Sequence, residues 1–223
     1  MTSFILKFKA AFILFFCLFA HANTSVGEVA LLGSEISYDK SLIIVHPFSD
    51  WDIESAAKPA VDDLIRFHKN LGSETIYVLD GHGTKGLYLE DPNPTLFIDA
   101  PAGQFSDVLL GKTFFFAGGS WSFCLSNAMT STISNTVALD IAFTVFTDAS
   151  FEFMQKENMA EYFSALTKDT REKVLLAHFE NIVKRATGPE ICMTIYYDGK
   201  SIGKTSGPCR RTGKVYLERF SQE

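Results

Sequence analysis

Blocks of apolar residues alternate with polar segments along the chain, and their lengths predict strands separated by helices. Short apolar runs without internal alternation are typical of strands that are covered on both faces, as in a parallel sheet. Such runs predict strands over residues 41–45, 75–79, 96–99, 112–117, 138–147, 191–197 and 215–220. Apolar residues at helical spacing predict helices over residues 53–71, 122–135, 158–166 and 169–185.

This order of elements predicts an α/β fold with a mainly parallel sheet and helices on both faces, a Rossmann-like three-layer arrangement. A C-terminal β-hairpin is expected in addition, because Asp198-Gly199 is a turn signal between apolar runs. Residues 84–111 predict a long loop, since Pro92, Pro94 and Pro101 interrupt any helix there. No repeat or second boundary is evident, so residues 23–223 are expected to form a single domain.

The first residues have the pattern of an export signal. Lys7 and Lys9 precede an apolar stretch over residues 10–20, which is too short to span a bilayer, and Ala20-His21-Ala22 is a small-x-small cleavage site. We therefore expect residues 1–22 to be a signal peptide and the mature protein to be periplasmic or secreted. No membrane association is expected once the signal is removed.

Charge and cysteine content narrow the possible partners and the redox state. The 223 residues carry a formal net charge of −6 without a basic cluster, so nucleic acid is not expected as a partner, whereas a small molecule is. An oxidising compartment favours pairing of cysteines. Cys192 and Cys209 flank the apparent hairpin and are predicted to form a disulfide, which leaves Cys124 outside it.

Cys124 occupies the segment most suggestive of chemistry. The apolar strand of residues 114–117 is followed by Gly118 and Gly119, which allow a tight turn, and then by small polar residues and a predicted helix. A helix N-terminus lowers the pKa of a nearby thiol, and its N–H groups can hold an oxyanion. The alternative is that Cys124 is simply one more small residue of the core.

Polar residues also follow other predicted strands. His46 follows the first strand, Asp80 and His82 follow the second, and Asp99 ends the short third strand. Parallel sheets bind ligands at the carboxyl ends of their strands, so these side chains are expected at one edge. Asp80 and His82 supply two candidate metal ligands, whereas catalytic metal sites usually take three from protein, so neither metal nor cofactor is expected. His68 and His178 lie within helices and are given no role.

Residues 117–125, AGGSWSFCL, resemble the nucleophile segment of the isochorismatase-like cysteine hydrolases, a family that includes the nicotinamidases. Residues 145–149 resemble the next strand of that family, and residues 77–83 resemble its D-x-H metal segment, although the further metal histidines are absent. The resemblance covers residues 41–150. It implies a hydrolase that acts on a C–N or related bond of a small molecule.

The chain departs from the catalytic set of that family, which consists of aspartate, lysine and cysteine. The corresponding positions here are His46, Asp99 and Cys124. The resemblance implies Cys124 as nucleophile, with His46 as its base, Asp99 as the carboxylate that orients the imidazole, and Phe123, Gly119 and Ser120 around the oxyanion. Asp50 beside the thiol is an alternative to Asp99. A catalytically inactive domain that binds a small molecule or a protein partner is the competing interpretation.

Overall fold

The computed structural model describes residues 41–46, 55–70, 75–79, 96–106, 109, 111–153 and 155–220, all within one structural unit. The predicted signal peptide lies outside the described residues, and so do Asp50, Asp80 and His82. None of the helices in the described ranges is long and apolar enough to cross a membrane.

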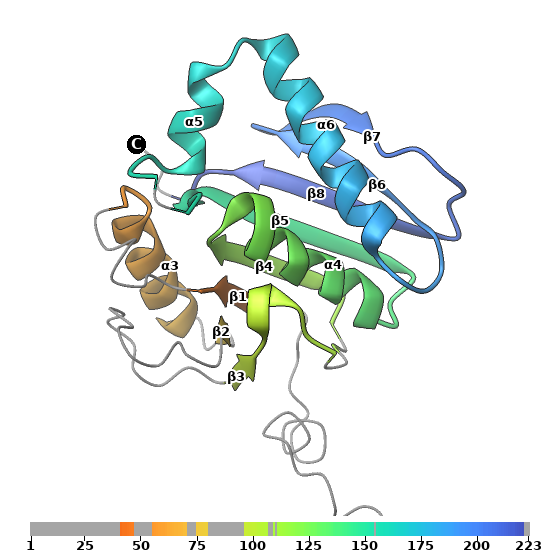
Figure 1. The fold of residues 1–223 in the computed structure, drawn as a ribbon, viewed down its shortest axis with the longest axis horizontal. Coiled ribbons are helices and arrows are strands. Elements are labelled where there is room, and N and C mark those ends of the chain that lie inside the picture. Colours follow the sequence, from red (N-terminus) through yellow and green to blue (C-terminus); the bar gives the residue numbers. More distant parts are fainter. Residues whose placement is uncertain are drawn as a thin grey trace, which may run out of the picture. The chain divides into compact units, whose positions relative to one another are not determined.

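The described residues form an eight-stranded sheet in the order β3-β2-β1-β4-β5-β8-β6-β7 (Figure 1). Neighbouring strands are parallel throughout, except that β6 and β7 are antiparallel. The prediction of a mainly parallel α/β fold is therefore confirmed. The strands are β1 (Ser41–Val45), β2 (Thr75–Leu79), β3 (Leu96–Asp99), β4 (Thr113–Gly118), β5 (Asp140–Ser150), β6 (Ile191–Tyr197), β7 (Lys200–Lys204) and β8 (Arg211–Glu218).

Helices cover both faces of this sheet, as predicted. The helices are α3 (Lys58–Asn70), α4 (Ser126–Asn135), α5 (Met159–Ala165) and α6 (Lys168–Arg185). Alternate residues of β1 point to opposite faces: Leu42 and Ile44 pack in the cluster with α3, whereas Ile43 and Val45 pack in the cluster with α4, α5 and α6. Because β1 is buried on both sides, its sequence is a continuous apolar run.

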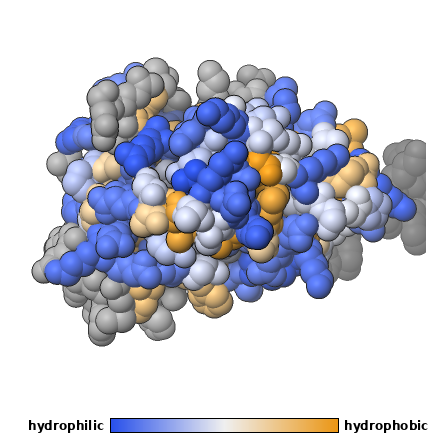
Figure 2. Space-filling model, turned by 90° about the horizontal axis from the view of Figure 1, so that it is seen from above, coloured by the Kyte–Doolittle hydropathy of each residue, from blue (hydrophilic) through white to orange (hydrophobic). Residues whose placement is uncertain are grey.

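Seen from the end of the molecule where α5 and α6 meet, most of the surface is polar and apolar residues form small separate areas (Figure 2). The large apolar side chains exposed among the described residues come from several elements: Phe67, Phe123, Val137, Leu139, Phe153, Tyr162 and Val174.

The C-terminal part of the chain differs from the prediction in one respect. The Asp198-Gly199 turn joins β6 to β7, a strand absent from the sequence-based prediction, and both turn residues have positive φ. The polar sequence of β7 concealed it, because an edge strand pairs on one side only. The predicted last strand is β8, which begins at Arg211 and lies parallel between β5 and β6.

Arg211 anchors the start of β8. Its side chain is buried, and it donates from Nε to the carbonyl oxygen of Ala138 at 3.1 Å and from Nη1 to that of Ile133 at 2.9 Å. The second carbonyl belongs to α4, so this guanidinium ties β8 to the end of that helix. These two bonds offset part of the cost of burying the guanidinium, whose Nη2 is buried without a hydrogen-bond partner among the described residues.

The predicted disulfide between Cys192 and Cys209 is confirmed. The two Cα atoms are 5.1 Å apart, and the cysteines lie 17 positions apart in the sequence. The bridge joins β6 to the segment that leads into β8, and it encloses the whole of β7.

Replacing both Cys192 and Cys209 with serine is expected to lower the free energy of unfolding by about 3 kcal/mol, because a cross-link that closes a loop of this size restricts the unfolded chain. Urea denaturation of the variant and of the oxidised wild type measures the difference. Wild-type protein treated with a thiol reductant is the control and should match the variant. Identical midpoints for oxidised and reduced wild type would contradict the prediction.

Candidate functional site

The candidate site lies where the strand order reverses. From β1 the chain proceeds outward to β2 and β3, and it then returns to β4 on the opposite side of β1. In open α/β sheets, ligands bind at the carboxyl ends of the strands at such a switch point. Here those ends are Val45 of β1, followed by His46, and Gly118 of β4, and Val45 pairs directly with Gly118. The described part of the chain therefore places His46 and the Cys124 segment on either side of this point.

Gly118 and Gly119 make the close approach between β4 and β1 possible. Gly118 has a φ of 96°, and a Cβ atom there would lie 2.1 Å from the carbonyl oxygen of Val45. The N–H of Gly119 donates to that same oxygen at 2.9 Å, and the peptide bond between Gly119 and Ser120 is cis. A Cβ atom on Gly119 would lie 2.4 Å from the ring of Phe151. The tight turn expected from the two glycines is thus present, and both positions require glycine.

Cys124 lies in the first turn of the helical segment that follows. A π-helical turn, η3 (Trp121–Leu125), leads directly into α4. The carbonyl oxygen of Ser120 accepts hydrogen bonds from the N–H groups of Phe123 at 3.2 Å and Leu125 at 2.9 Å. The predicted helix start is therefore confirmed. Cys124 is partly exposed and also packs against the core on the α4 side of the sheet.

The segment after β3 packs directly on Cys124. It forms the 3₁₀ turn η2 (Pro101–Gly103), and a Cβ atom on Gly103 would lie 2.2 Å from the carbonyl oxygen of Cys124. Asn127 strengthens the contact, because its Nδ2 donates to the carbonyl oxygen of Ala102 at 2.8 Å. The η2 turn, which follows Asp99 in the sequence, therefore lies against the backbone of Cys124.

The strand register relates the other predicted site residues to one another. His46 follows β1 with a φ of 41°, and its N–H donates to the carbonyl oxygen of Val78 at 2.9 Å. Asp99 is the last residue of β3, paired with Leu79, so β2 lies between the strands that carry His46 and Asp99. The roles of His46 and Asp99 stay predictions. In the described ranges, no group of three or more His, Cys, Asp or Glu residues could hold a metal ion.

Glu152 was not anticipated from the sequence. Its carboxylate accepts hydrogen bonds at the start of η3, the helical turn that contains Cys124 and is called the start of the cysteine helix below. Oε2 accepts the N–H of Ser122 at 2.9 Å, and Oε1 accepts the N–H of Phe153 at 2.9 Å and the hydroxyl of Ser120. Burial raises the pKa of Glu152, but the hydrogen bonds from Ser120, Ser122 and Phe153 outweigh it and hold the pKa below its usual value. A negative charge therefore occupies the positive end of the helix.

His178 of α6 is a second unanticipated neighbour. Its ring stacks on Trp121 with centroids 4.8 Å apart, and its Nε2 lies 3.2 Å from Oγ of Ser126. That hydroxyl donates its proton to the carbonyl oxygen of Trp121, so Nε2 carries the imidazole proton and donates to Ser126. Burial, and secondarily Arg185, lowers the pKa of His178 to about 4 against an opposing effect of Glu152. The one available signal was its place among apolar residues at helical spacing in the helix predicted over residues 169–185.

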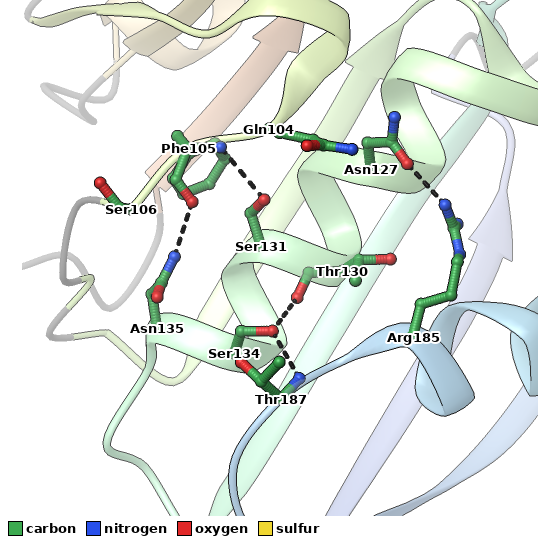
Figure 3. Close-up of a pocket in the computed structure, with 10 residues that line it drawn as sticks. All are labelled: Gln104, Phe105, Ser106, Asn127, Thr130, Ser131, Ser134, Asn135, Arg185 and Thr187. Atoms are coloured by element: carbon green, nitrogen blue, oxygen red, sulfur yellow. Dashed lines mark hydrogen bonds between the residues drawn. The ribbon is translucent and has the colours of Figure 1, made fainter.

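A polar pocket of about 330 Å³ opens beside α4, starting one turn after Cys124 (Figure 3). Ser131 and Asn135 bind the backbone of Phe105, which follows η2, and Nη1 of Arg185 donates to Oδ1 of Asn127 at 2.5 Å. The pocket is therefore formed by the loop after η2, by α4 and by the end of α6. Its lining residues are Gln104, Phe105, Ser106, Asn127, Thr130, Ser131, Ser134, Asn135, Arg185 and Thr187.

Comparison with known proteins finds a likeness among solved structures. No protein-family model matches the sequence, and no curated protein matches it. The structure is similar to that of the nicotinamidase SaPncA from Staphylococcus aureus, with a TM-score of 0.40 and 15% sequence identity over 64% of this chain and 95% of that one.

The half-buried, neutral His178 should make the protein sensitive to acid. Above pH 6.5 the imidazole is neutral in both folded and unfolded states. Between pH 6.5 and about 4 only the unfolded state binds the proton, so the free energy of unfolding falls by about 1.4 kcal/mol per pH unit as the pH is lowered. His178→Gln should remove this slope in urea denaturation series across that range.

The buried His68 of α3 provides the matched comparison, because burial also lowers its pKa to about 4. His68→Gln should remove a similar slope, and the wild type should show both contributions together. An unchanged pH dependence in His178→Gln would contradict the assignment of a neutral His178.

Proposed function

We propose that the protein is an exported isochorismatase-like hydrolase that uses Cys124 to cleave a C–N or related bond of a small molecule. The observation that carries this proposal is the position of Cys124, partly exposed in the first turn of a helix that starts at the switch point of a parallel sheet. The disulfide between Cys192 and Cys209 supports export, because disulfides persist in oxidising compartments.

In the proposed reaction, His46 takes the thiol proton, and the sulfur of Cys124 attacks the carbonyl carbon of an amide. The tetrahedral intermediate collapses as the C–N bond breaks and the nitrogen leaves with the proton from His46, which produces a thioester. Water, deprotonated by His46, then attacks the thioester and releases the acid and the thiol. Asp99 would orient His46, and β3, which ends at Asp99, leads through η2 to the backbone of Cys124.

The proposed oxyanion site is formed by the turn that comprises Gly119, Ser120 and Phe123. The N–H of Phe123 donates to Ser120, so it would have to leave that acceptor to stabilise an oxyanion. Such a rearrangement at the start of a helix is a local change, because the same carbonyl oxygen keeps its bond from Leu125.

Glu152 favours the second candidate function, a catalytically inactive domain that binds a small molecule or a protein partner. Its carboxylate sits at the helix start, where it opposes the positive dipole that would otherwise favour a thiolate. A thiol beside this charge is a weaker nucleophile at neutral pH. The two functions therefore differ in a measurable property, which is the ionisation of Cys124.

Alkylation of Cys124 by iodoacetamide as a function of pH separates the two functions. If Cys124 is the nucleophile, the rate should rise with an apparent pKa below the usual thiol value of about 8.5. His46→Ala should raise that apparent pKa, and Glu152→Gln should lower it by removing the nearby negative charge. A panel of small amides tests turnover, which Cys124→Ser should abolish.

Glu157→Gln is the matched control. Like Glu152, Glu157 lies in the segment between β5 and α5, but its carboxylate is exposed. This substitution should leave the alkylation profile unchanged. Mass spectrometry of the labelled peptide assigns the label to Cys124. An apparent pKa at or above 8.5 that does not respond to His46→Ala would identify the inactive binding domain instead.

A further inference from the structure

The face of the sheet opposite α4, α5 and α6 is covered by α3 only in part. On β1, β4 and the carboxyl half of β5, apolar residues of this face pack with α3. Farther along the sheet, the register aligns Ala142 of β5, Lys214 of β8, Thr194 of β6 and Lys204 of β7 in one row across four strands. In the described part of the chain, no helix packs on this row.

A groove of about 550 Å³ runs along this row, at the amino ends of the parallel strands. Three lysines line it, Lys112, Lys204 and Lys214, and all three are exposed. Its single acidic residue is Asp140, whose carboxylate accepts the hydroxyl of Thr212. The other lining residues are Thr113, Ile141, Ala142, Cys192, Thr194, Thr212 and Gly213.

In the part of the chain that the structure describes, no acidic side chain pairs with the lysines of this groove. None of the three forms an ion pair with any other described residue, in contrast to Lys58 and Lys168 on the helices, which pair with Asp62 and Glu172. Three lysines and one carboxylate therefore line the groove, and the carboxylate is already hydrogen-bonded. The chain as a whole has a formal net charge of −6. Such a local reversal of charge attracts anions to a concave surface.

The spacing of the lysines favours a ligand with more than one negative group. Lys204 and Lys214 lie on strands separated by β6, so their Cα atoms are about 10 Å apart, given the usual strand spacing. Lysine binds phosphate as a flexible point charge. Thr194 lies between Lys204 and Lys214 in the row, and its hydroxyl and that of Thr113 offer neutral donors. A single carboxylate would satisfy one lysine, whereas linked phosphates would satisfy two or three.

We propose that this groove is a binding site for a small ligand that carries two or more linked phosphate groups. Its volume falls in the range of small-molecule sites. The site lies at the opposite end of β4 from the turn that leads to Cys124, so it is independent of the hydrolase proposal.

Isothermal titration of the full chain with inorganic tripolyphosphate tests the proposal. We expect saturable binding with one ligand per chain, weakened by added sodium chloride. The variant K204A/K214A should bind at least tenfold more weakly. The variant K173A/K184A is the matched control, because these exposed lysines lie on α6, on the other side of the sheet, and it should bind as the wild type does.

K204Q/K214Q provides a second variant that keeps the length of both side chains, and circular dichroism reports the fold of each protein. Undiminished binding in K204Q/K214Q, or equal weakening in K173A/K184A, would overturn the site. No saturable binding to the wild type would overturn it as well. If a glutamate octapeptide bound as tightly as tripolyphosphate, the groove would recognise charge alone, and the assignment of a phosphate ligand would be wrong.

Discussion

The contact between the backbones of Gly118 and Val45 is the constraint on which the arrangement of the site depends. The carbonyl oxygen of Val45 fills the space that a side chain on Gly118 would need, and it also accepts the N–H of Gly119. The ring of Phe151 fills the corresponding space beside Gly119. A larger residue at either position would push β4 from β1 or displace Phe151, and the start of the cysteine helix would move with it. The position of Cys124 relative to His46 is therefore a consequence of backbone packing.

In the same region, the positive end of the helix dipole and the negative charge of Glu152 oppose each other. The helix start favours a negative charge, and Glu152 already supplies one through hydrogen bonds to Ser120 and Ser122. His178 lies in the same region but is kept neutral by burial, so it does not balance that charge. The start of the helix that carries Cys124 therefore combines the positive end of a helix dipole with a carboxylate that already occupies it.

The sequence predicted the fold but gave no indication that Glu152 and His178 contact the start of the helix that carries Cys124, and the reason is physical. Strands such as β1 are buried on both faces, so their composition alone identifies them, and the two glycines before Trp121 predicted the turn correctly. Glu152 meets Ser122 across 30 residues, and His178 meets Ser126 across 52. Nothing in the local composition of either residue indicates such a contact, because it arises from the order of strands and helices in space. The edge strand β7 was missed for a related reason, since pairing on one side leaves its sequence polar.

The placement of β8 has a consequence for the order in which the sheet assembles. β8 follows β5, β6 and β7 along the chain, yet it lies inside the sheet, where it pairs with β5 on one side and β6 on the other. Until β8 is in place, the β6–β7 hairpin has no other described strand to pair with, and the adjoining edge of β5 stays open. An open strand edge is a site for pairing with other chains, so a chain in which β8 has not yet paired is exposed to misassembly. Removal of β8 would separate the sheet into two parts rather than trim its edge.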